Sequence, residues 1–95
     1  MPIKSVQLDS YDRDSLRDLM RIPGVGKSIA RDLIDIGIHQ VADLKHADPD
    51  DLYARSNAYA GVRQDPCLLY VFRCAVYFAS TKKPNPEKLK WWDWK

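Results

Sequence analysis

The sequence has few of the features that mark secreted and membrane proteins. Its first residues, MPIKSVQLDS, contain no apolar run and no small-residue cleavage site, so they do not predict a secretory signal. The longest apolar stretch, residues 67–79, is interrupted by Arg73 and is too short to cross a bilayer. The chain has only two cysteines, which without a signal indicates reduced thiols rather than a disulfide framework. We therefore expect a cytoplasmic protein with no membrane partner.

Alternating polar and apolar runs of the kind that form β-strands are also lacking. A chain of 95 residues is expected to fold as one domain around a modest core, and its apolar spacing predicts helices only. We thus expect a compact all-α domain of four to five helices over residues 1–95. Its expected parts are a helical motif at 11–36, a related second segment at 40–60, an apolar helix at 66–80 and a basic, Trp-rich tail at 81–95.

Short polar residues and prolines indicate where the helices begin. Asp12 or Ser10 can cap a first helix. Asp48-Pro49 and Asp65-Pro66 each place an aspartate at the cap and a proline at the first helical position. Gly61 is expected to end the helix that Asp48-Pro49 begins, because glycine adopts the left-handed conformation without steric cost.

Residues 24–28 read Gly-Val-Gly-Lys-Ser, which invites comparison with nucleotide-binding loops. A Walker A loop would need a glycine where Arg21 stands, and it would have to follow a β-strand, whereas the preceding residues have helical spacing. A dinucleotide-binding loop would need a third glycine at the position of Ile29. Both nucleotide motifs are therefore absent, and we expect neither a nucleotide nor another cofactor.

The same residues fit a tight connection between two helices. Apolar residues at helical spacing stand on both sides of it: Leu16, Leu19 and Ile22 before, and Ala30, Leu33 and Ile34 after. Two glycines permit left-handed dihedrals and close approach of a ligand, and Val25 between them should turn into the core. This pattern resembles the helix-hairpin-helix motif, which holds one phosphate of a DNA strand without reading the bases.

The resemblance implies a phosphate site at the start of the second helix. Unpaired amides and the helix dipole favour an anion there, Lys27 adds a charge and Ser28 adds a hydroxyl donor. Arg21 or Arg31 could assist. The expected phosphate-binding residues are Gly24, Val25, Gly26, Lys27, Ser28 and Arg31. The alternative is that the glycines serve only a turn or a protein contact.

The rest of the chain is similar to one family. The stretches DIGIHQVADLKHADPDDLYARSNAYAG, DPCLLYVFRCAVYFAS and LKWWDWK resemble the small bacterial pathogenicity-locus family of helix-hairpin-helix proteins, some of which are labelled mitomycin-resistance proteins. The resemblance extends from about residue 16 to residue 95 and implies a DNA-related role. It also implies a degenerate second hairpin, with residues 46–49 in place of Gly-x-Gly. Asp48, Asp50 and Asp51 would repel a phosphate there, so we expect this second unit to be structural.

No set of residues carries a catalytic or metal-binding signature. Cys67 and Cys74 lie too far apart along one helix for a disulfide and are expected to be small buried hydrophobes. The acids Asp50 and Asp51 are explained by their place in a first helical turn. Arg73, inside the apolar helix, is expected to pair with an acid. We therefore expect no metal and no enzymatic activity.

All three tryptophans lie in the tail, at Trp91, Trp92 and Trp94. They either fold back to close the small core, which we favour, or stack on an unpaired base or on a partner surface. Two functions follow. The first is a sequence-nonspecific module that binds double-stranded DNA, in DNA repair or stress. The alternative is a protein-interaction adaptor or homodimerisation module that keeps the hairpin fold without binding DNA.

Overall fold

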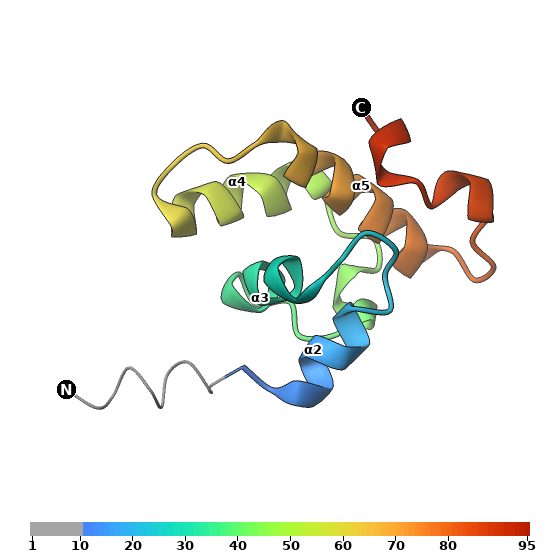
Figure 1. Ribbon diagram of the computed structural model, residues 1–95, viewed down its shortest axis with the longest axis horizontal. Coiled ribbons are helices and arrows are strands. Elements are labelled where there is room, and N and C mark those ends of the chain that lie inside the picture. Colours follow the sequence, from blue (N-terminus) through green and yellow to red (C-terminus); the bar gives the residue numbers. More distant parts are fainter. Residues whose placement is uncertain (1–10) are drawn as a thin grey trace.

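A computed structural model describes residues 11–95, which form four α-helices and three short 3₁₀ helices, with no β-strand in this part of the chain (Figure 1). The prediction of an all-α domain is confirmed. The elements are α2 (Arg13–Leu19), α3 (Lys27–Asp35), η1 (Val41–Leu44), α4 (Pro49–Ala60), α5 (Pro66–Ser80), η2 (Pro86–Lys88) and η3 (Trp91–Asp93).

The helices begin where the capping residues predict. The Asp12 carboxylate accepts a hydrogen bond from the amide of Ser15 at the start of α2, and Ser10, the alternative cap, lies outside the described residues. Asp48 and Asp65 cap α4 and α5 in the same way, each followed by proline at the first helical position. Helix α4 ends at Gly61, whose φ of 75° is left-handed. Local sequence chemistry therefore accounts for these ends.

Helix α5 organises the packing of the domain. It lies against α4, against η1 and against η3, while α3 bridges between α2 and α4 (Figure 1). The side chain of Phe72, on α5, is fully buried, and such burial contributes about 1.5–3 kcal/mol. The buried cluster draws on every α-helix and on the connections between them: Leu19, Ile22, Val25, Ala30, Leu33, Ile38, Val41, Leu44, Leu52, Val71, Phe72 and Ala75.

Two connections in the chain share one backbone construction. We call residues 22–27 the first turn and residues 44–49 the second turn. Their third residues, Gly24 and His46, both have positive φ, 86° and 62°. In each turn the amide of the fourth residue donates to the carbonyl of the first at 3.0 Å, and the fifth residue is the N-cap of the following α-helix. The sequence therefore builds the same turn twice, once with glycines and once without.

The two turns differ in what they offer to an anion. Asp48 caps α4 with its own carboxylate, and Asp50 and Asp51 follow in the first turn of that helix. Gly26 caps α3 without any side chain, and no acid stands in the first turn of α3. The free amides at the start of a helix carry partial positive charge, and in α4 this charge is already compensated by the three nearby carboxylates. Only the first turn therefore leaves that charge available.

The tail, residues 81–95, folds back along α5 (Figure 1). Trp91 packs against the buried cluster, and the Trp94 ring lies on Tyr77 with centroids 5.3 Å apart. Trp92 remains 52% exposed. Two of the three indoles thus pack on the folded domain, in line with the favoured prediction, and the third is half exposed.

The sequence led to specific predictions for three residues of α5. Arg73 does reach an acid, since its guanidinium lies 3.9 Å from the Asp50 carboxylate, and it also donates to the carbonyl of Trp94 at 2.8 Å. Cys74 is buried as expected, but Cys67 is exposed. The prediction that both cysteines are buried was wrong for Cys67, because it lies in the first turn of α5, where the helix projects beyond the core.

Candidate anion-binding pocket

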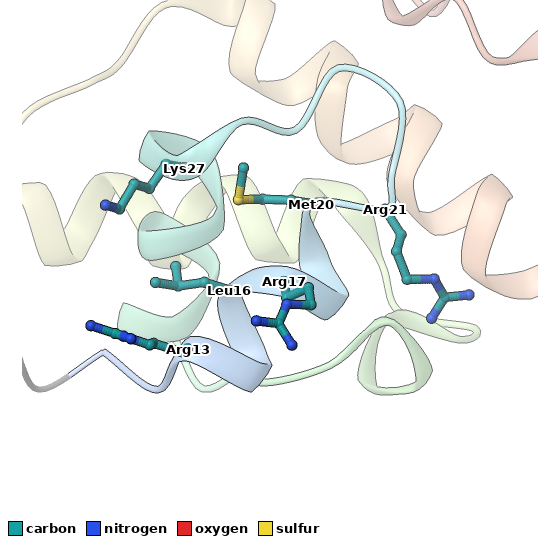
Figure 2. A pocket seen from close by; sticks show the side chains of 6 residues that line it. All are labelled: Arg13, Leu16, Arg17, Met20, Arg21 and Lys27. Atoms are coloured by element: carbon teal, nitrogen blue, oxygen red, sulfur yellow. The ribbon is translucent and has the colours of Figure 1, made fainter.

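A shallow, open pocket of about 610 Å³ lies between α2 and the start of α3. The apolar side chain of Leu16 lies between Lys27 and Arg13, and that of Met20 lies to one side of Lys27 (Figure 2). The complete lining is Arg13, Leu16, Arg17, Met20, Arg21 and Lys27. We call it the basic pocket, because its four charged residues are all cations around an apolar floor.

The spacing of the arginines explains why they gather. Arg13 and Arg17 are four residues apart within α2 and share one face of that helix, and Arg21 follows just beyond the end of the helix. The first turn then reverses the chain and brings Lys27, the first residue of α3, to the same hollow. Of these four cations the sequence analysis selected Lys27 and named Arg21 as a helper. It missed Arg13 and Arg17, although their spacing was a readable signal.

Only some of the cations in the basic pocket form salt bridges. Arg21 donates to the Asp18 carboxylate at 2.7 Å. Arg17 lies 4.0 Å from Asp14, with both side chains more than 80% exposed, and such a pair contributes little. Within residues 11–95, no carboxylate lies within ion-pair distance of Arg13 or of Lys27. These two cations therefore remain available to an anion.

The start of α3 carries hydrogen-bond donors beside Lys27, which is the only one of the predicted phosphate-binding residues that lines the pocket. The first amides of an α-helix have no partner within the helix, and here Gly26 supplies no capping side chain. Lys27 and Ser28, the first two helical residues, are both exposed. An anion at this point would meet amide donors, the positive end of the dipole and the Lys27 ammonium together.

The remaining predicted residues take different positions. Gly24, Gly26 and Ser28 are exposed at the turn. Val25 faces the core, and its amide is already bonded to a carbonyl of the turn, so it offers an anion nothing directly. Arg31 does not line the basic pocket, because its guanidinium lies over the ring of Tyr11, 5.7 Å from the centroid.

The far side of the first turn is bordered by the tail. The indole of Trp91 lies against Gly24 so closely that a Cβ atom at Gly24 would stand 2.7 Å from its Cδ1 atom. A left-handed φ and this contact both require glycine at position 24. The first turn thus has a cation just before it and another at its end, and an indole packs against its middle. The contact between Trp91 and Gly24 was not predicted from the sequence.

A second, smaller hollow of about 320 Å³ on another part of α2 has the opposite charge. The amide of Val41 donates a hydrogen bond to the Asp18 carboxylate at 2.7 Å. This bond is the main cause of the lowered pKa of Asp18, and the hydrogen bond from Arg21 is the second cause. Helix α2 is therefore acidic on one side and basic on the other. The lining of this hollow is Asp12, Asp14, Ser15, Asp18, His39 and Gln40.

Other chemistry has little support in residues 11–95. This part of the chain has no group of three or more His, Cys, Asp or Glu side chains that could hold a metal ion. A hydrogen bond to Asp65 raises the pKa of the Cys67 thiol, and burial raises the pKa of Cys74, so neither is an activated thiolate. No described helix has the length and apolar character needed to cross a membrane.

Comparison with known proteins identifies two relatives. The profile of a family described as "Pathogenicity locus" matches residues 12–95. Mitomycin resistance protein McrB of Streptomyces lavendulae is 41% identical over 75 residues, which cover 79% of this chain and 68% of that protein. Porphobilinogen deaminase 1 of Streptomyces avermitilis is 29% identical over 93 residues, covering 90% of this chain but only 28% of that protein. No solved structure matches the chain significantly.

Proposed function

The chain belongs to the pathogenicity locus family, and we propose that it is a sequence-nonspecific DNA-binding module. In this proposal, residues 11–36 act as a helix-hairpin-helix motif and hold a backbone phosphate at the first turn. One observation carries it: four cations line a pocket beside a helix start that has neither a capping side chain nor an acid. We place this module in the cytoplasm.

Phosphate suits the charge and the donors of this site. Arg13 and Lys27 have no carboxylate partner within residues 11–95, so a phosphate would neutralise cations that the fold leaves unpaired. The exposed amides at the start of α3 would donate to its oxygens. None of these groups reads a base edge, so contacts of this kind fix the position of a strand without selecting a sequence.

The openness of the basic pocket favours a polymer over a free nucleotide. Sites for small molecules usually enclose most of the ligand, whereas this pocket is open and its charged side chains come from α2, from Arg21 beyond that helix and from the start of α3. A DNA backbone can pass over such a surface and present one phosphate after another. Because the second turn carries its own acids, we propose that DNA is held at the first turn alone and that the second turn is structural.

The test is a salt titration of binding to duplex DNA. Four cations predict a slope of log K against log salt of about −2 to −4, since each phosphate contact contributes about −0.9. Lys27→Ala should weaken binding several-fold and make the slope shallower by about one. Lys45→Ala, which removes the same charge from the exposed second turn, is the matched control and should change binding little.

Two results would contradict the proposal. One is the absence of duplex binding at low salt. The other is an equal loss of affinity in Lys27→Ala and Lys45→Ala, which would mean that net charge alone determines binding. A role in DNA repair or stress is part of the proposal.

A protein-interaction adaptor or homodimer is the second candidate, and the 52% exposure of Trp92 is the observation that favours it. Trp91 and Trp94 are already engaged within the domain, which leaves one indole for a partner protein. A complex that survives high salt and is lost in Trp92→Ala would favour the adaptor.

We propose no enzymatic activity, because the similarity to porphobilinogen deaminase 1 covers only 28% of that enzyme.

A further inference from the structure

We infer that Trp92 is a stacking platform for an unpaired base, so that the protein prefers DNA in which single-stranded nucleotides adjoin a duplex. This inference rests on the proposed DNA-binding function and names the form of DNA that the site takes. It follows from the position of Trp92, from how the tail holds it and from the charge around it.

Trp92 adjoins Trp91, the residue whose indole contacts the first turn. Arg21 lies just before the first turn and Lys27 lies at its end, and both residues line the basic pocket. Gly24, in the middle of the turn, contacts the indole of Trp91. The Trp92 ring meets Trp91 edge to face, with centroids 5.7 Å apart. A strand whose phosphate occupies the pocket and whose next nucleotides cross the turn would therefore reach the exposed indole.

The tail holds this indole in place rather than leaving it loose. Arg73 of α5 donates to the Trp94 carbonyl at 2.8 Å, and the indole nitrogen of Trp94 donates to the Lys88 carbonyl at 2.7 Å. Trp92 thus stands between Trp91 and Trp94, which are both packed on the domain. A ring that is ordered before binding loses little entropy when a base stacks on it.

The charge around Trp92 indicates the chemistry of its occupant. The tail carries five lysines against two acids, and Lys90, close to Trp92 in the sequence, is 48% exposed and lies 3.5 Å from the Glu87 carboxylate in an exposed pair. An occupant that meets both this surface and the basic pocket must carry anions and an aromatic face. An unpaired nucleotide has both, whereas an intact duplex hides its base faces within its own stack, and stacking of single bases on aromatic side chains is sequence-tolerant.

The experiment compares a short blunt duplex with the same duplex extended by a single-stranded overhang of about six nucleotides. Affinities are measured by fluorescence anisotropy of labelled DNA, and stacking is measured by quenching of tryptophan emission. Wild-type protein should bind the overhang about tenfold more tightly. Trp92→Ala should abolish that preference and most of the quenching, and leave blunt-duplex affinity unchanged.

Two variants make the result specific. Tyr59→Ala removes another exposed aromatic, on α4, and should keep the preference. Lys27→Ala should weaken binding of both DNAs alike, because the phosphate contact is common to them. Equal binding of both DNAs by the wild type, or a preference that survives in Trp92→Ala, would overturn the stacking inference while leaving duplex binding intact. Absence of binding to both DNAs would overturn the inference together with the proposed function.

Discussion

Replacing Gly24 by alanine tests the contact between the first turn and the tail. The substitution adds one methyl group at a residue whose φ is 86° and whose Cβ would stand 2.7 Å from Trp91. Two costs follow: an L-residue must adopt a left-handed conformation, and the indole or the turn must shift. We expect both to lower the free energy of unfolding.

The two costs can be separated. The left-handed conformation costs about 1–2 kcal/mol in alanine, and overpacking against a held ring costs about 1–3 kcal/mol. Gly61→Ala provides the matched control, because Gly61 also has a positive φ, 75°, but its Cβ would meet nothing within 4 Å. We therefore expect a loss of about 2–5 kcal/mol for Gly24→Ala against about 1–2 kcal/mol for Gly61→Ala.

Urea unfolding followed by far-ultraviolet circular dichroism gives these free energies without depending on tryptophan emission. A double-mutant cycle completes the test: in a Trp91→Ala background, Gly24→Ala should cost only the conformational share, about 1–2 kcal/mol. The reasoning is refuted if Gly24→Ala lowers the free energy of unfolding no more than Gly61→Ala does, and by the same amount in the wild-type and Trp91→Ala backgrounds. Those results would mean that the indole does not pack on the turn.

Two further predictions concern contacts that join separate elements. Arg73→Ala should lower the free energy of unfolding by about 1–2 kcal/mol, because the bond to the Trp94 carbonyl is lost, and should speed proteolysis of the tail; an unchanged digestion rate would count against this contact. Hydrogen bonds from Val41 and Arg21 lower the pKa of Asp18. The ionised carboxylate therefore stabilises the fold at pH values above the ordinary aspartate pKa, and this stabilisation is lost as the pH falls through the lowered pKa. Asp18→Asn should therefore flatten the stability–pH curve below about pH 4 in denaturation at several pH values, and an equally steep curve would argue against this linkage.

Helix ends and the first turn could be predicted because local chemistry determines them. An aspartate before a proline caps a helix wherever it occurs in an exposed chain, and this is what Asp48 and Asp65 do. The position of Val25 in the core followed equally from its place between two glycines. These features depend on neighbours within a few residues, which the sequence displays directly.

The basic pocket was only partly predictable. Lys27 was selected because it follows the glycines, but Arg13 and Arg17 contribute only because the chain reverses between α2 and α3. Arg31, which the sequence placed near a phosphate, instead lies over Tyr11. Which arginines face one hollow depends on the angle between helices, and no local pattern specifies that angle.

The sequence by itself determined an all-helical chain, the points at which its helices begin, and a glycine turn before an uncapped helix, because propensity, capping and dihedral preference act over a few residues. Only the tertiary structure decided that Trp91 closes on Gly24 while Trp92 stays exposed. The three indoles have the same chemistry and stand within four residues of each other. Their different surroundings arise from the way the tail returns along α5, since burial depends on contacts between residues far apart in the chain.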